Sequence, residues 1–142
     1  MPESTERSHP RIDFYEMSGR FKDPVEVAGA LVGKAYPETA DIAVVGTHAQ
    51  LEALDARLWD KPDGRFLAHG IDDAAAPIRL LENAPQDAAL LINLAADAEM
   101  PDGEYKRVLE IVPPDEQAKK RLRQRWMDWR ARGAELHHHL LK

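Results

Sequence analysis

The sequence predicts an α/β protein with a mostly parallel central sheet flanked by helices. Short apolar runs bounded by turn residues alternate with longer segments whose apolar residues recur at helical spacing. The run Asp41–Gly46 is apolar throughout its interior, as a strand buried on both faces would be. Since no repeat or low-complexity segment divides the 142 residues, we expect one domain over residues 12–142. A disordered lead-in is expected over residues 1–11.

Capping and turn signals set the bounds of the first two helices. Asp23 and Pro24 suit the N-cap and the first helical position, and the Tyr36-Pro37 pair ends this helix. Thr47 suits the N-cap of the second helix, which stops before Pro62-Asp63-Gly64.

Strands are predicted where apolar, β-branched or aromatic residues run between turn signals. They are Ile12–Met17, Asp41–Gly46, Arg65–Ala68, Pro77–Leu81, Ala88–Leu94 and, as the last strand, Arg107–Val112. Pro113 and Pro114 stop that strand, and a final helix is expected from Asp115 to Gly133. The histidines at 137–139 are expected in a solvated tail, because consecutive side chains point to different faces and cannot easily share a metal ion.

Composition and motifs exclude several classes of function. Without cysteine there are no disulfides or thiolate metal sites. No apolar run approaches the roughly 20 residues that a membrane span needs, and Met1–Pro10 lacks the apolar core of a secretory signal. We therefore expect a cytoplasmic protein that does not contact the membrane.

A nucleotide-dependent or other enzyme is not expected either. The cluster Gly29–Ala35 places three residues between its glycines, where a phosphate loop needs four, and Ala35 stands where Ser or Thr is required. No nucleophile elbow is present, and no carboxylate pair stands out as an acid and base. The expectation is a Rossmann-like fold without a phosphate loop, with no cofactor, no metal and no catalytic residues.

The strongest local anomaly is the segment Lys119–Arg132. It holds seven basic residues and one acidic residue, so its formal charge is +6, whereas the whole chain carries −6 and the remainder therefore −12. On an ideal helix, at about 100° per residue from Leu122, the apolar side chains form one stripe. This stripe comprises Ala118, Leu122, Trp126 and Trp129.

Three cations follow one side of this stripe, next to Trp126. Lys119, Arg130 and Arg123 project at about +60°, +80° and +100°, and we call them the basic edge. A guanidinium can hold a carboxylate and an indole can form the floor of a ring pocket, which suits an acidic peptide that also brings a hydrophobic ring. Two alternatives stay open: a solvated face whose tryptophans only pack the core, and direct binding of single-stranded nucleic acid. The acidic remainder of the chain disfavours the second.

A further stretch of interest carries Trp59 and Phe66 on either side of a Pro-Asp-Gly turn. Aromatic residues at such a position either anchor an interface or close the core, and the sequence leaves both open.

Three blocks resemble the chi subunit family of bacterial DNA polymerase III, an accessory protein of the clamp-loader complex. The blocks are Phe14-Tyr15 in the first strand; L-D-x-x-L-W-x-x-P from Leu54, followed by Phe66 and His69; and R-x-R-aromatic-x-x-aromatic-R from Arg123, followed by Gly133. Their order and spacing fit nearly the whole chain from Ile12 onward.

The resemblance implies a non-catalytic adaptor between two partners. One is the acidic C-terminal tail of the single-stranded-DNA-binding protein, which ends in an apolar-Pro-Phe carboxylate and gives indirect access to single-stranded DNA. The other is the psi subunit, which leads to the clamp loader, or a helicase-like protein that uses the same face.

Site residues are carried over by their positions. By resemblance the tail site comprises Val112, Lys119, Arg123 and Trp126, to which the helical projection adds Arg130; the psi-facing site comprises Trp59 and Phe66. The family usually has Tyr where this chain has Trp126. An expected basic residue is replaced by Met127, followed by Asp128, which implies a weaker or more apolar tail site.

Overall fold

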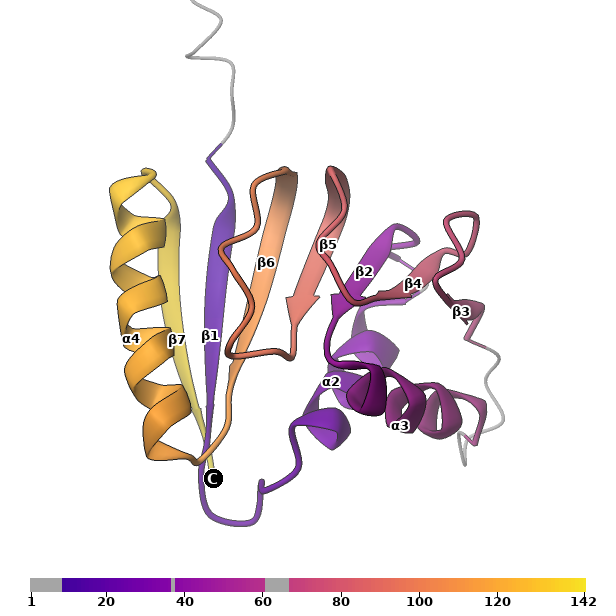
Figure 1. The fold of residues 1–142 in the computed structure, drawn as a ribbon, viewed down its shortest axis with the longest axis horizontal. Coiled ribbons are helices and arrows are strands. Elements are labelled where there is room, and N and C mark those ends of the chain that lie inside the picture. The colour runs from indigo at the N-terminus through magenta and orange to yellow at the C-terminus, as the bar shows by residue number, and fades with distance from the viewer. Residues whose placement is uncertain (1–8, 37, 61–66) are drawn as a thin grey trace, which may run out of the picture.

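A computed structural model describes residues 9–36, 38–60 and 67–142 (Figure 1). Within these ranges seven strands form one sheet in the order β3-β4-β2-β5-β6-β1-β7, and every ladder is parallel. The strands are β1 (Arg11–Met17), β2 (Ile42–Val45), β3 (His69–Ile71), β4 (Ile78–Leu81), β5 (Asp87–Asn93), β6 (Glu104–Val112) and β7 (Glu135–Leu141). The helices are α2 (Pro24–Ala35), α3 (His48–Trp59) and α4 (Glu116–Ala131). The predicted parallel α/β architecture is confirmed.

The helices begin where the sequence places their caps. The Asp23 side chain accepts a hydrogen bond from the backbone N–H of Val25 at the start of α2. Thr47 and Gln50 form a reciprocal capping box at α3, and the Asp115 carboxylate accepts from the backbone of Ala118 at α4.

Successive strand residues point to opposite faces of the sheet, and each face packs into its own apolar cluster. In β2, Ile42 and Val44 pack with the apolar residues of α2 and α3, whereas Ala43 and Val45 join the cluster that includes Leu122 of α4. Figure 1 shows α4 beside β1 and β7 at one end of the sheet and α3 toward the other end. No helix within the described ranges is long and apolar enough to cross a membrane.

Two sequence-based predictions of strands are wrong. The short strand near Ala68 lies instead at His69–Ile71, inside the predicted loop; residues 65 and 66 lie outside the described ranges. Arg107–Val112 is not the last strand, because the expected histidine tail forms β7, which pairs with β1 from Arg11↔Glu135 to Met17↔Leu141. At the N-terminus, β1 begins at Arg11, one residue earlier than predicted, and residues 1–8 lie outside the described ranges.

Strand β7 is stabilised by contacts that single-residue propensities do not encode. Gly133, with φ of +83°, follows α4, and the chain then runs back along β1. Each histidine of β7 then meets a carboxylate: His137 lies 2.6 Å from Glu135, His138 lies 2.8 Å from Glu16, and His139 lies 2.7 Å from Asp13.

Asp13 is a fully buried carboxylate at the centre of β1. Arg11 and Arg107 donate hydrogen bonds to it at 3.1 and 2.8 Å, and the His139 ring lies at 2.7 Å. Burial alone would raise the pKa of Asp13, but the hydrogen bonds from Arg11, His139 and Arg107 outweigh it and lower the pKa to about 2. The ionised carboxylate therefore stabilises the fold at neutral pH.

Asp13→Asn is expected to lower the free energy of unfolding by about 1–2 kcal/mol at pH 7. The contribution of a carboxylate whose pKa is depressed in the folded state is present above its ordinary pKa of 3.8 and is lost as the pH falls through about 2. The difference in the free energy of unfolding between variant and wild type, measured by urea unfolding, should therefore shrink to about half by pH 3. An unchanged gap at pH 3 would show that Asp13 acts through shape, not charge.

Candidate functional site

The apolar stripe of α4 packs onto the sheet, as its spacing predicts, with one exception. Ala118, Leu122 and Trp129 are buried, but Trp126 is only half-buried. Its projection of about +40° places it at the margin of the stripe, where the helix turns away from the sheet. There its ring lies 5.2 Å from the ring of Phe14, tilted by 57°.

A cavity of about 410 Å³ opens at this margin, between α4 and strands β1, β6 and β7, and we call it the helix-edge cavity. It is lined by Phe14, Glu16, Val112, Lys119, Leu122, Arg123, Trp126 and His138. The structure thus brings together four of the five residues predicted for the tail site. Arg130 does not line the cavity; it is exposed and lies seven residues beyond Arg123, about 10 Å along the helix.

The helix-edge cavity combines an apolar floor with a cationic rim. Phe14, Val112 and Trp126 supply rings and methyl groups, and Lys119 and Arg123 stand at the rim. The Arg123 guanidinium is exposed and makes no ion pair or hydrogen bond with any residue in the described ranges. Lys119 lies 3.9 Å from Glu16 and 3.8 Å from Glu116, which are long ion-pair distances. The cavity can therefore accept one hydrophobic ring together with a carboxylate.

The opposite edge of α4 has a different role that the sequence interpretation missed. Arg121, Arg125 and Arg132 project at about −100°, −60° and −80° and hold the loop of residues 94–103, which joins β5 to β6. Arg121 pairs with Asp97 at 2.8 Å, and Arg132 donates to the Pro101 carbonyl at 2.7 Å. Three of the seven cations are thus structural, and the same helical projection, extended to this edge, separates them from the basic edge.

Arg125 is buried and also pairs with the buried carboxylate of Glu110. Its guanidinium donates to the carbonyls of Ala96, Ala98 and Glu99, and its Nε lies 3.6 Å from Glu110. Glu110 accepts further hydrogen bonds from Asn93 Nδ2 at 2.7 Å and from Trp129 Nε1 at 2.9 Å. Burial raises the pKa of Glu110, and the Arg125 charge and these two hydrogen bonds oppose that rise. This network ties α4 to the sheet.

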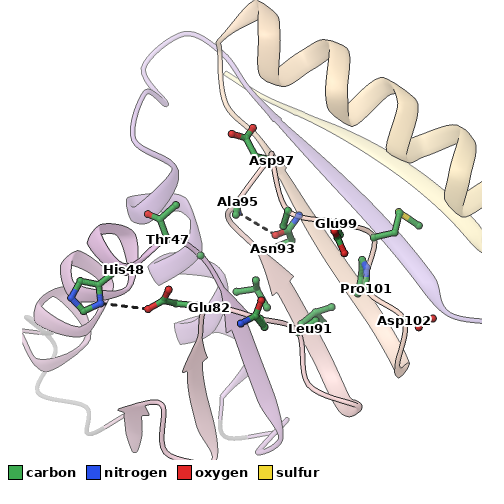
Figure 2. A pocket seen from close by; sticks show the side chains of 16 residues that line it. Thr47, His48, Glu82, Leu91, Asn93, Ala95, Asp97, Glu99, Pro101 and Asp102 are labelled. Atoms are coloured by element: carbon green, nitrogen blue, oxygen red, sulfur yellow. Dashed lines mark hydrogen bonds and ion pairs between the residues drawn. The ribbon is translucent and has the colours of Figure 1, made fainter.

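A larger cavity, of about 700 Å³, lies at the carboxyl ends of β2 and β5, where Rossmann-like folds bind nucleotides (Figure 2). Its lining residues include four acids and one histidine: Glu82, Asp97, Glu99, Asp102 and His48. No Lys or Arg of the described chain lines it. At the start of α3, the backbone N–H of Thr47 already donates a hydrogen bond to Gln50 Oε1 at 2.9 Å, so the helix terminus is occupied by the chain's own side chain. The charge and the filled helix terminus both oppose phosphate binding.

Trp59, predicted for the psi-facing site, is 60% exposed at the end of α3, with its ring centroid 4.7 Å from that of His69. Of the two alternatives for this residue, closure of the core is therefore wrong. Phe66 lies outside the described residues. No group of three or more potential metal ligands occurs in the part of the chain that the structure describes.

The fold and its cavities define a parallel α/β protein with a basic, aromatic cavity beside its last helix. The sequence profile of the family described as DNA polymerase III chi subunit, HolC, matches residues 10–137. A relative from Pseudomonas aeruginosa, named DNA polymerase III subunit chi, is 30% identical over an aligned length of 139, with 92% of this chain and 96% of the relative covered. The chain belongs to the DNA polymerase III chi subunit family, and its role lies in DNA replication as an accessory subunit of that polymerase.

Proposed function

We propose that the chain is a non-catalytic adaptor of the bacterial replicative DNA polymerase III holoenzyme, acting in the cytoplasm. It binds the C-terminal tail of the single-stranded-DNA-binding protein and connects it, through psi, to the clamp loader. The observation that carries the proposal is the helix-edge cavity, in which Val112, Lys119, Arg123 and Trp126 meet. Family membership supports the connection to replication.

The chemistry of the tail matches that of the cavity. The terminal phenylalanine ring packs against Trp126 and Val112, and its α-carboxylate meets the Arg123 guanidinium and the Lys119 ammonium. Arg130, about two turns further along α4, is placed to attract the acidic residues that precede the terminal phenylalanine.

The second partner, psi or a helicase-like protein, contacts the surface that carries Trp59. Trp59 is an exposed aromatic residue of the type that anchors interfaces, and the sequence places Phe66 seven residues after it. Because α3 and α4 lie toward opposite ends of the sheet in Figure 1, both partners can be held at the same time.

Arg123→Ala is expected to weaken binding of a labelled tail peptide by about 1.5–3 kcal/mol, because a charged hydrogen-bond partner of the carboxylate is lost. Fluorescence anisotropy measures the affinity, which should also fall with added salt because the contact is partly exposed. Arg121→Ala removes the same charge from the opposite edge and should leave the affinity nearly unchanged. Superimposable titrations of wild type and Arg123→Ala would contradict the placement of the carboxylate.

Direct binding of single-stranded DNA by the basic edge is the competing function. It requires that an oligonucleotide bind without any partner protein and that single arginine substitutions reduce the salt dependence of that binding. A gel shift with oligonucleotide alone distinguishes the two functions, and the adaptor predicts no shift at physiological salt.

A further inference from the structure

Two residues that line the helix-edge cavity have no part in the proposed function. Glu16, from β1, is the one carboxylate among the described residues that line it, and His138, from β7, is the one imidazole. Glu16 Oε1 lies 2.8 Å from His138 Nε2, and Glu16 Oε2 lies 3.9 Å from Lys119 Nζ. The Glu16 side chain is 32% exposed, so part of it faces solvent.

The Glu16 carboxylate disfavours binding of the peptide carboxylate for which the rest of the cavity is suited. It repels an incoming carboxylate and occupies part of the Lys119 charge that the ligand needs. The Lys119 ammonium is shared further with Glu116 at the start of α4, which lies 3.8 Å away. Of the two rim cations, Arg123 alone has no ion-pair partner within the described ranges and can meet the ligand unopposed.

We infer that Glu16 is a built-in competitor for the carboxylate of the bound peptide and thereby limits the affinity of the helix-edge cavity. This inference rests on the proposed function. When the peptide binds, its carboxylate takes the Lys119 contact, and His138 retains Glu16 at the wall of the cavity. His138 is therefore a positioning residue that acts through Glu16, and the pair keeps the complex weak enough to exchange.

A second Glu–His pair, in β7, provides a matched control for Glu16 and His138. Glu135 and His137 form the same type of pair, with His137 Nε2 2.6 Å from Glu135 Oε2, and neither lines the cavity. His137 immediately precedes His138 and so points to the opposite face of the sheet. Glu135→Gln thus changes the net charge as Glu16→Gln does, without touching the cavity.

The test is a titration of the full chain with labelled tail peptide, with all variants measured at the same pH and salt concentration. Glu16→Gln is expected to tighten binding about three- to fivefold, the effect of a partly exposed charge, and Glu135→Gln to leave it unchanged. His138→Ala is expected to weaken binding about twofold, because Glu16 then turns fully to Lys119. In the Glu16→Gln background His138→Ala should have no effect, since no carboxylate is left to hold.

A peptide with a terminal amide separates competition from a general charge effect. The gain from Glu16→Gln should vanish with that peptide, because the gain arises from repulsion of the terminal carboxylate. The inference would be overturned if Glu16→Gln improved binding of both peptides equally. It would also be overturned if Glu16→Gln bound the carboxylate peptide no more tightly than wild type does. Either result would leave the adaptor function standing. If neither wild type nor any variant binds the peptide, the proposed function fails, and the inference fails with it.

Discussion

Replacing Arg125 with alanine is expected to lower the free energy of unfolding by about 3–5 kcal/mol, the cost of breaking a buried ion pair from one side. Glu110 is fully buried, and the variant leaves it without its nearby cation. The carbonyls of Ala96, Ala98 and Glu99 lose their donor as well, which frees the loop that joins β5 to β6.

Urea unfolding followed by circular dichroism measures this loss. Arg123→Ala is the matched control, because the same residue type on the same helix is exposed and unpaired in the described chain, and the change should stay within about 0.5 kcal/mol. Adding Glu110→Gln to Arg125→Ala should recover part of the stability, since the double variant no longer buries an unpaired charge. Similar small losses for Arg125→Ala and Arg123→Ala would contradict a structural role for Arg125.

Replacing Trp126 with alanine is expected to weaken binding of the tail peptide by about 2–4 kcal/mol, the range for an aromatic anchor at an interface. The indole is half-buried against Phe14 and forms part of the apolar floor of the helix-edge cavity, so its removal takes away the surface on which the ligand ring packs.

Trp126→Phe keeps a ring at this position and should retain most of the affinity, which separates loss of ring packing from a change of the helix. Both variants need the same peptide titration and a thermal unfolding curve, because part of the Trp126 ring also packs against the core. Unchanged affinity in a folded Trp126→Ala variant would place the ligand ring elsewhere on the molecule.

Local signals in the sequence were sufficient for most elements and for part of the lining of the helix-edge cavity. Asp23, Thr47 and Asp115 mark the starts of helices because each offers a side-chain oxygen to backbone N–H groups that otherwise lack partners. The spacing of Lys119, Arg123 and Trp126 places them on one edge of a helix, and the cavity confirms that they lie together. The roles given to them remain proposals.

Features that depend on contacts between distant segments could not be predicted in this way. Strand β7 exists because β1 offers it a partner along its whole length, and a run of three histidines carries no strand signal of its own. In the sequence Glu110 resembles an ordinary polar strand residue. Its contacts with Arg125 and Trp129 of α4, which lie 15 and 19 residues downstream, appear only in the folded structure. Glu16 and His138 likewise meet only after β1 and β7 pair.

The most direct test of the adaptor function is one set of titrations of the wild-type chain with three ligands. These are a tail peptide ending in a phenylalanine carboxylate, the same peptide ending in an amide, and a single-stranded oligonucleotide alone. We predict saturable binding of the first, binding of the second weaker by about 1.5–3 kcal/mol, and no binding of the third at physiological salt. Binding of the oligonucleotide without partner, together with no saturable binding of the carboxylate peptide, would contradict the adaptor and favour direct recognition of nucleic acid.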